Sequence, residues 1–426
     1  MKTLTLRTLG CSKNTVDSEH VEASLKGVYA IVSEAPADVC LINTCSFIAD
    51  AKQQSIDEIL ECCRMKEEGL FGKVVVFGCL PQRYPDDMPS LIPEVDAWFG
   101  ARDFDPMLEY LGAEKPFDEA SRILSTPSHY AYLKISEGCD RRCSYCAIPL
   151  IRGQHRSVPV EVLVAEAEAL AAKGVKELLV IAQDITYYGL DIYGKRDLAR
   201  LLRALSAVEG IEWIRLHYSY PSSFPEDVLD EMASNPKICP YMDIPLQHSS
   251  SKVLGMMHRG IDEEGTRTLV KKFRERVPGI VLRTTLIVGH PGEGEEEFEN
   301  LLQFVRDCRF ERLGAFTYSE EEDTYSAAHY KDEVPEELKQ ERYDRLMTLQ
   351  EGISYEYNLS RVGKVERVVA DRFEDGILVC RSRGESPEVD GEILVKGPEC
   401  LVGSFFDVRI TGADSYDLCA EVIIKK

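Results

Sequence analysis

The stretch ISEGCDRRCSYCAIP, residues 135–149, places three cysteines in the spacing C-x3-C-x2-C directly after a strand-like run from Tyr132 to Ser136. Tyr145 stands just ahead of the last thiol. Three cysteines supply only three corners of a four-iron cube, so one iron keeps an open position, whereas a structural zinc site normally has four protein ligands. The spacing therefore predicts a [4Fe-4S] cluster whose open iron binds a cofactor. Its expected ligands are Cys139, Cys143 and Cys146.

A zinc knuckle is the alternative, but it requires a fourth ligand, and His155, the nearest candidate, has no characteristic spacing. The cysteine pattern, aromatic residue included, resembles the signature of the radical S-adenosylmethionine enzymes. This resemblance implies that the open iron holds the amino and carboxylate groups of S-adenosylmethionine. It also implies that one electron from the cluster cleaves this cofactor to a 5′-deoxyadenosyl radical, which abstracts hydrogen from an unactivated carbon.

The composition predicts a multidomain protein of a reducing, cytoplasmic compartment. A chain of 426 residues with 44% hydrophobic residues is expected to form two or three domains with real cores. No run of eighteen apolar residues is present and the start, MKTLTLRTLG, lacks a continuous apolar signal region, so we expect neither membrane insertion nor secretion. Fourteen cysteines in such a protein are expected to be metal ligands and buried thiols.

The charge balance favours a protein partner over a nucleic acid. With 50 basic and 73 acidic residues, the net charge is −23, which repels a polyphosphate backbone unless a local basic patch overrides it. A strongly basic protein would instead be attracted. The alternative is that the acidity only keeps the protein in solution.

A second set of three cysteines follows three strand-like runs near the N-terminus, Thr3 to Leu9, Val39 to Asn43 and Val74 to Phe77. These runs alternate with helix-like segments, which is typical of a parallel α/β sheet. The carboxyl ends of parallel strands share one edge, where such folds collect their ligands, although a lone cysteine is by default a small buried hydrophobe. We therefore expect a second cluster on Cys11, Cys45 and Cys79. The remaining cysteines are expected to be structural: Cys40, Cys62, Cys63, Cys239, Cys308, Cys380, Cys400 and Cys419.

The middle of the chain alternates strands with amphipathic helices. Six such units predict an incomplete barrel, in which functional groups gather at the carboxyl ends of the strands. On this basis we expect Gln183, Gly289 and Gly292, with Tyr145, to bind the cofactor. The glycines also fit a tight turn, and the glutamine could satisfy buried backbone groups. The predicted strands are Tyr132 to Ser136, Leu178 to Ala182, Trp213 to Tyr218, Tyr241 to Pro245, Val281 to Val288 and Arg312 to Tyr318.

Three further polar residues near the predicted strand ends have open roles. His217 and His248 belong to a residue type that is more often packed and hydrogen-bonded than catalytic. Arg152 fits either a loop salt bridge or a clamp on the carboxylate of the cofactor. We therefore assign no catalytic residue beyond the cluster ligands.

The C-terminal part consists of short β-like runs separated by glycine and aspartate turns, after a charged helical stretch from Pro335 to Arg361. This pattern predicts a small five-stranded barrel. Residues 355–426 hold 10 basic and 14 acidic residues and no basic aromatic stripe, which favours binding of a basic protein surface. The predicted strands are Lys364 to Asp371, Gly376 to Arg381, Glu392 to Val395, Ser404 to Gly412 and Leu418 to Ile424.

The three-part organisation resembles the methylthiotransferases along essentially the whole chain. One branch of that family thiomethylates adenosine in transfer RNA, and another thiomethylates an aspartate of ribosomal protein S12. Five segments of this chain resemble the second branch. They are GCSKNTVDSE, YCAIPLIRGQHRS, AQDITYYGLD, LHYSYPSSFP and DIPLQHSSSKVLGMMHRG. The transfer-RNA branch typically has VPYTRGxExSR after its cluster cysteines and a basic C-terminal domain. Asp323, in YSEEEDTYSA, stands where the family usually has glycine, which leaves open only the backbone shape of that loop.

The resemblance implies an α/β multidomain fold. It has an N-terminal parallel α/β sheet domain in residues 1–118, a radical S-adenosylmethionine partial (βα) TIM-like barrel in 125–357, and a C-terminal five-stranded β-barrel, the TRAM domain, in 360–426. It also implies two [4Fe-4S] clusters, S-adenosylmethionine as radical source and methyl donor, and a low-potential electron donor. Methylthiolation of the aspartate β-carbon is the expected reaction, with transfer-RNA adenosine as the alternative substrate. Neither a direct nucleic-acid substrate nor a membrane is expected as a partner.

Overall fold

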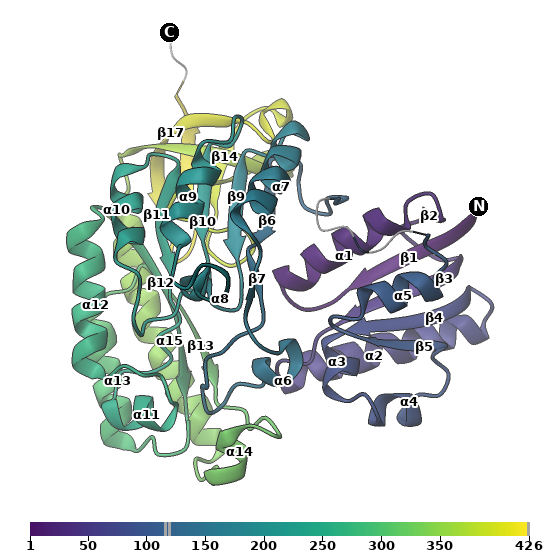
Figure 1. The fold of residues 1–426 in the computed structure, drawn as a ribbon. Helices are drawn as coiled ribbons and strands as arrows, with labels where there is room; N and C mark the ends of the chain where they lie inside the picture. The colour runs from purple at the N-terminus through teal and green to yellow at the C-terminus, as the bar shows by residue number, and fades with distance from the viewer. Residues whose placement is uncertain (115–116, 118–120, 424–426) are drawn as a thin grey trace.

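The computed structural model describes residues 1–114, 117 and 121–423, which form three units (Figure 1). An N-terminal α/β unit lies beside a larger strand-and-helix unit, and the C-terminal barrel lies against one end of the larger unit. The predicted boundary at residue 118 and the predicted strand end at Ile424 lie outside the described residues.

The N-terminal unit is a five-stranded sheet in the order β2-β1-β3-β4-β5, and every neighbouring pair is parallel. The central strands β3 and β4 are rich in Val, Ile and Leu and almost wholly buried, because apolar clusters cover both faces of the sheet. The predicted parallel α/β sheet is confirmed, with two further edge strands. Its elements are β1 (Lys2–Thr8), α1 (Ser12–Leu25), β2 (Tyr29–Ile31), β3 (Ala37–Thr44), α2 (Ala49–Glu67), β4 (Phe71–Gly78), α3 (Cys79–Arg83), α4 (Asp87–Leu91), β5 (Ala97–Gly100) and α5 (Phe104–Tyr110).

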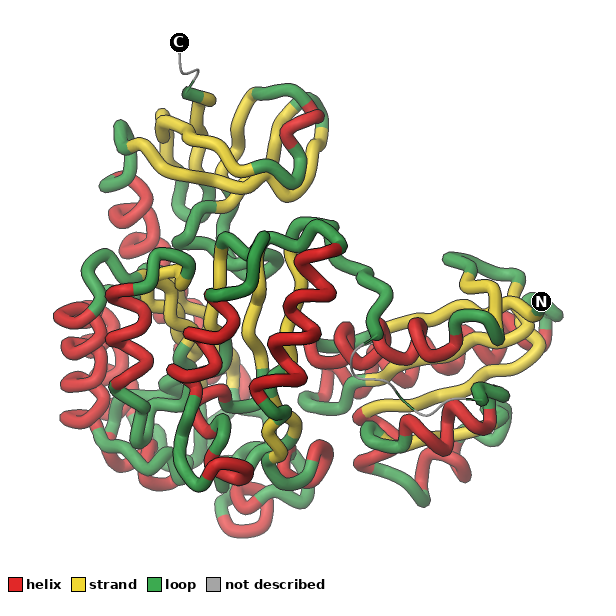
Figure 2. The backbone as a smooth tube through the Cα atoms, turned by 45° about the horizontal axis from the view of Figure 1, so that its top comes forward, coloured by secondary structure: helices red, strands yellow, loops and turns green. Residues whose placement is uncertain are grey.

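The central unit is a six-stranded parallel sheet in the order β13-β12-β11-β10-β9-β6. Helices cover its outer face, and the two edge strands do not pair with each other, so the predicted incomplete barrel is confirmed (Figures 1 and 2). Its strands are β6 (Tyr130–Lys134), β9 (Glu177–Ile181), β10 (Trp213–Leu216), β11 (Ile238–Asp243), β12 (Val281–Val288) and β13 (Arg312–Thr317). Its longer helices are α7 (Val160–Ala172), α9 (Leu198–Ser206), α10 (Asp227–Ser234), α12 (Glu263–Arg276), α13 (Glu295–Cys308) and α15 (Glu336–Leu359).

Short elements decorate the ends of this sheet. They are β7 (Ser136–Glu137), α6 (Ile148–Arg152), β8 (Arg156–Ser157), a 3-10 turn (Ile185–Tyr187), α8 (Leu190–Tyr193), α11 (Ser251–Met256) and α14 (Tyr325–His329). The strands β7 and β8 form a small hairpin that brackets the cysteine-rich loop. No helix in the described ranges is both long and apolar enough to span a membrane.

The C-terminal unit is a closed five-stranded barrel in the order β14-β15-β16-β18-β17, as predicted (Figure 2). Closure leaves the barrel without a free sheet edge, and alternate apolar residues of its strands fill the interior. Its elements are β14 (Val365–Glu374), β15 (Ile377–Arg381), β16 (Ile393–Lys396), a 3-10 turn (Glu399–Leu401), β17 (Phe405–Ala413) and β18 (Leu418–Val422).

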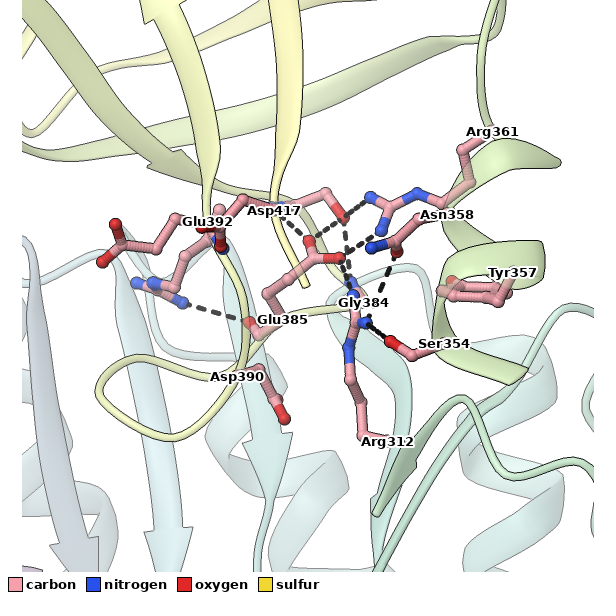
Figure 3. Close-up of polar contacts among 12 residues, drawn as sticks. Arg312, Ser354, Tyr357, Asn358, Arg361, Gly384, Glu385, Asp390, Glu392 and Asp417 are labelled. Atoms are coloured by element: carbon pink, nitrogen blue, oxygen red, sulfur yellow. Dashed lines mark hydrogen bonds and ion pairs between the residues drawn. The ribbon is translucent and has the colours of Figure 1, made fainter. Parts of the chain in front are cut away.

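The loop between β15 and β16, residues 382–392, joins this barrel to the central unit. Glu385 of the loop lies between Arg312 at the start of β13 and Arg361 after α15 (Figure 3). Its carboxylate is 2.9 Å from the Arg312 guanidinium and also accepts from the Ser382 N–H at 3.0 Å. Burial opposes ionisation of Glu385, but the two guanidinium groups outweigh this effect and hold the pKa of the carboxyl well below its ordinary value. The C-terminal barrel is therefore anchored by a buried charge network.

Candidate active site

A cavity of about 460 Å³ lies between the N-terminal unit and the central sheet. The amino-terminal unit contributes the loops at the carboxyl ends of β1, β3 and β4, and the central unit contributes the loop after β7. Both predicted cysteine sets are brought together on its wall. They are the N-terminal triad, Cys11, Cys45 and Cys79, and the barrel triad, Cys139, Cys143 and Cys146.

Glycines let the N-terminal triad approach closely. Gly10 has φ of +91°, and a Cβ added to it would lie 2.6 Å from the Cβ of Cys45. The backbone N–H of Cys45 donates to the hydroxyl of Ser55 at 3.0 Å, and that hydroxyl donates back to the Cys45 carbonyl at 2.8 Å. The loop that carries Cys45 is therefore held by two hydrogen bonds to one hydroxyl.

Replacement of Gly10 by alanine is expected to displace Cys45 and impair the N-terminal site, because the added methyl group would overlap this cysteine. We expect iron content to fall by about half and product formation to fall at least about tenfold. Gly27→Ala is the matched control, because Gly27 has φ of +93° but no atom within 4 Å of the added Cβ. Iron analysis of both variants measures the effect, and equal iron loss in the two variants would show that backbone strain alone is responsible.

The barrel triad is surrounded by polar groups that sequence reasoning did not identify. The Arg259 guanidinium donates to the sulfur of Cys143 at 3.3 Å and stacks over the Tyr220 ring at 4.2 Å. The Tyr220 hydroxyl lies 3.6 Å from the same sulfur. Arg259 falls in the quoted segment DIPLQHSSSKVLGMMHRG, but only the fold brings it to the cysteines. Tyr145 lines the same cavity, and its hydroxyl is 3.5 Å from Arg259.

The donor chemistry fits iron-sulfur clusters at both triads. Burial raises the pKa of Cys139 and that of Cys79 to about 12, so without a metal these thiols are neutral at physiological pH. Binding to iron deprotonates a thiol. Within the described part of the chain, no group of three His, Cys, Asp or Glu side chains is arranged to hold a single metal ion. A cluster places a different demand on its ligands, because each thiolate binds a different iron.

Arg152, at the end of α6, links the two sides of the cavity. Its guanidinium donates to Asp17 at 2.8 Å and to Asn14 at 2.6 Å, and it lies 3.4 Å from the sulfur of Cys79. Asp17 and Asn14 belong to α1 of the N-terminal unit, so the contact crosses between units. Of the two roles left open by the sequence, the structure shows the salt bridge, and it also places the guanidinium beside a predicted cluster ligand.

Of the other predicted cofactor-binding residues, one lines the cavity and two do not. Gln183 lines it, donates to Glu137, and has a buried carbonyl oxygen with no hydrogen-bond partner among the described residues. Gly289 and Gly292 are not part of the wall. Both have positive φ, and an added Cβ would lie 2.3 Å from the side chains of Lys339 and Met256, respectively. Close packing explains both glycines, and cofactor contact by them stays a prediction.

The histidines considered above are packed and hydrogen-bonded, and none of them lines the cavity. His217 lies 3.0 Å from the hydroxyl of Ser386 in the loop 382–392. His248 accepts from the Ser250 N–H at Nδ1, so its Nε2–H donates to Glu293 at 3.0 Å. His155 lies 3.0 Å from the Ser157 hydroxyl.

The remaining cysteines lie away from the cavity, and no cysteine forms a disulfide in the described residues. Six of them are buried or half-buried, as expected for structural thiols, whereas Cys400 and Cys419 are exposed and do not contribute to a core. The loop around Asp323 has the backbone shape that a glycine at this position would favour. Asp323 has φ of +63°, the left-handed region that glycine adopts most readily. The neighbouring Glu321 pairs with Arg83 at 2.9 Å, so this loop contacts the N-terminal unit.

Comparison with known proteins agrees with this architecture. Residues 133–305 match the radical SAM superfamily, residues 3–100 match a family described as uncharacterized protein family UPF0004, and residues 362–423 match the TRAM domain. A solved radical S-adenosylmethionine methyltransferase, TsrM from Kitasatospora setae, has a TM-score of 0.57 at 15% identity and covers 89% of this chain and 81% of its own. That likeness shows the fold. The fold and the cysteine triad define a radical S-adenosylmethionine enzyme, which uses an iron-sulfur cluster and S-adenosylmethionine.

Three relatives narrow the class. Proteins named ribosomal protein uS12 methylthiotransferase RimO are 52% identical in Cytophaga hutchinsonii, 49% in Bacteroides fragilis and 50% in Porphyromonas gingivalis. The alignments cover 98%, 99% and 98% of this chain and 97%, 99% and 98% of the relatives. The chain belongs to this RimO family of radical S-adenosylmethionine methylthiotransferases, as the resemblance predicted.

Proposed function

We propose that this chain transfers a methylthio group to the β-carbon of an aspartate in ribosomal protein uS12, with one [4Fe-4S] cluster on each cysteine triad. The observation that carries this proposal is the single cavity whose wall contains both triads. A carbon radical must meet the sulfur donor before it meets solvent, so the two sites have to share one enclosed space. The names of the relatives support the choice of uS12 as substrate.

The barrel triad would hold the cluster that binds S-adenosylmethionine, and the N-terminal triad would hold the cluster that carries sulfur. When bound, these groups supply a radical that removes hydrogen from the substrate carbon, a methyl group, and the sulfur that replaces the hydrogen. An external low-potential electron donor is required to start this chemistry. No direct nucleic-acid substrate is needed.

The chain's own residues fix and shield the two triads. Arg259 donates to the sulfur of Cys143, beside which the Tyr220 hydroxyl also lies, and Arg152 donates to the sulfur of Cys79. Donors of this kind stabilise thiolate charge and orient the ligands of a metal site. Tyr145 and Gln183 complete the wall beside the barrel triad and are the side chains we place next to the cofactor.

The charge of the chain suits this substrate, and its thiols suit a reducing compartment. A net charge of −23 attracts a basic ribosomal protein and accelerates encounter at low salt. The C-terminal barrel, acidic rather than basic, would hold part of that protein. Fourteen cysteines without a disulfide in the described residues fit the reducing cytoplasm.

Anaerobic turnover with purified uS12 and transfer RNA offered in parallel tests the substrate. With S-adenosylmethionine and a reductant, we expect mass spectrometry to find a methylthio group on one aspartate of uS12 and unmodified adenosine. Because the encounter is electrostatic, the rate with uS12 is expected to fall as salt is raised. Methylthiolated adenosine with unmodified uS12 would refute the proposed substrate.

A further inference from the structure

Four cationic side chains line the cavity, and three of them have strong partners in the protein. Arg141 donates to Asp184 at 2.8 Å, and Arg152 donates to Asp17 at 2.8 Å. Arg259 donates to the sulfur of Cys143 and to a backbone carbonyl. The fourth cation is Lys13.

Lys13 differs from the three arginines because its ammonium has neither a hydrogen-bond acceptor nor a carboxylate partner in the part of the chain that the structure describes. The ammonium instead lies over the Tyr218 ring, whose centroid is 3.0 Å from the Lys13 Nζ. Only 8% of the residue is exposed. An aromatic face compensates a buried ammonium only partly, and a buried charge normally has an opposite charge beside it. No carboxylate of the described residues therefore neutralises this cation.

The position of Lys13 connects this cation to the sulfur-carrying side of the cavity. It lies in the first turn of α1, two residues after Cys11, and reaches across to Tyr218 just beyond the end of β10. A group bound there lies at the boundary between the two units, where the proposed reaction has to occur. An aspartate that presents its β-carbon to this space brings its carboxylate with it, because the carboxyl carbon is bonded to the β-carbon.

We propose that Lys13 binds the side-chain carboxylate of the substrate aspartate and so selects aspartate over its neutral analogues. The inference rests on the proposed function and adds the residue that recognises the substrate side chain. An ammonium next to the reacting residue fixes the β-carbon at one position. The methionyl carboxylate of S-adenosylmethionine is the other carboxylate that enters the cavity, but the placement of Lys13 on α1 favours the substrate.

The test compares the affinities of two uS12 proteins, one with the target aspartate and one with asparagine in its place. Binding to the anaerobic holoenzyme is measured by fluorescence anisotropy for the wild type, Lys13→Met and Lys13→Arg. We expect the wild type to bind the aspartate form about 10- to 100-fold more tightly, as for hydrogen bonds to charged groups. Lys13→Met, whose stem still covers Tyr218, is expected to reduce this ratio to about one, and Lys13→Arg to keep most of it.

The ratio is informative even if a variant holds less iron, because both substrates are measured on the same preparation. Lys52→Met is the matched control, since Lys52 belongs to the same unit, pairs with Glu321 and does not line the cavity. It is expected to keep the wild-type ratio.

Three outcomes would overturn the inference. In the first, Lys13→Met keeps both the preference for aspartate and the wild-type affinity for S-adenosylmethionine. In the second, this variant keeps the preference but binds S-adenosylmethionine more weakly when uS12 is absent, which assigns Lys13 to the cofactor carboxylate. In the third, the wild type binds neither form of uS12, so that the proposed substrate itself fails and the inference fails with it.

Discussion

A Cys45→Ala variant is expected to form 5′-deoxyadenosine from S-adenosylmethionine while yielding no methylthiolated uS12. A Cys139→Ala variant is expected to lose both products. The difference follows from the position of the two residues, because Cys139 belongs to the barrel triad of the central unit and Cys45 to the triad of the N-terminal unit. We expect each lost product to decrease on the order of a thousandfold or more, as for removal of an essential group.

Single-turnover assays with quantification of 5′-deoxyadenosine and uS12 by mass spectrometry measure both products. Cys63→Ala is the matched control, because Cys63 is also a buried cysteine of the N-terminal unit but does not line the cavity. It is expected to retain both activities. Methylthiolated uS12 from the Cys45 variant would show that the N-terminal triad does not deliver the sulfur.

The second large effect concerns stability. Glu385→Ala is expected to weaken attachment of the C-terminal barrel by about 3–5 kcal/mol, because it leaves the buried guanidinium groups of Arg312 and Arg361 without their shared carboxylate. Glu392→Ala is the control from the same loop. Glu392 pairs with Arg372 at 2.7 Å, but both side chains are partly exposed, so its removal is expected to cost about 0–1 kcal/mol.

Urea unfolding followed by the fluorescence of Trp213 measures this difference. Trp213 packs edge-to-face on Phe405 of the C-terminal barrel at 4.7 Å, so it reports on this interface, and Trp98→Phe removes the other tryptophan. The folded-state pKa of Glu385 lies well below its unfolded value. The stabilisation is therefore fully present above the ordinary glutamate pKa and is lost only as the pH falls towards the depressed value. Equal midpoints for the two variants would contradict a role for this network.

The sequence was sufficient to predict the three units and the two cysteine triads. Parallel strands end at a common edge, so Cys11, Cys45 and Cys79 could be expected to converge without knowledge of the packing. The shared cavity could not be predicted in this way, because it depends on how two units dock. That docking uses contacts such as Arg152 with Asp17, which are far apart in sequence.

The functional side chains that could not be predicted from the sequence also depend on contacts between distant parts of the chain. Lys13 and Arg259 are common residue types in helices and loops, and each becomes informative only when the fold places it against Tyr218 or Cys143. The same holds for Glu385, whose arginine partners come from two separate elements of the chain. Gly289 and Gly292 are a different case, because their motif at a strand end predicts cofactor contact, whereas packing against Lys339 and Met256 gives a second reason for glycine at both positions.

The central claim is that one cavity serves both the radical and the sulfur. Anaerobic turnover with uS12 that carries deuterium on the β-carbon of the target aspartate tests it most directly. The account predicts that deuterium appears in 5′-deoxyadenosine and that the same aspartate gains a methylthio group in place of that deuterium. If instead uS12 were methylthiolated while 5′-deoxyadenosine remained free of deuterium, the radical would not act on the carbon that receives the sulfur, and the shared cavity would not be the site of the reaction.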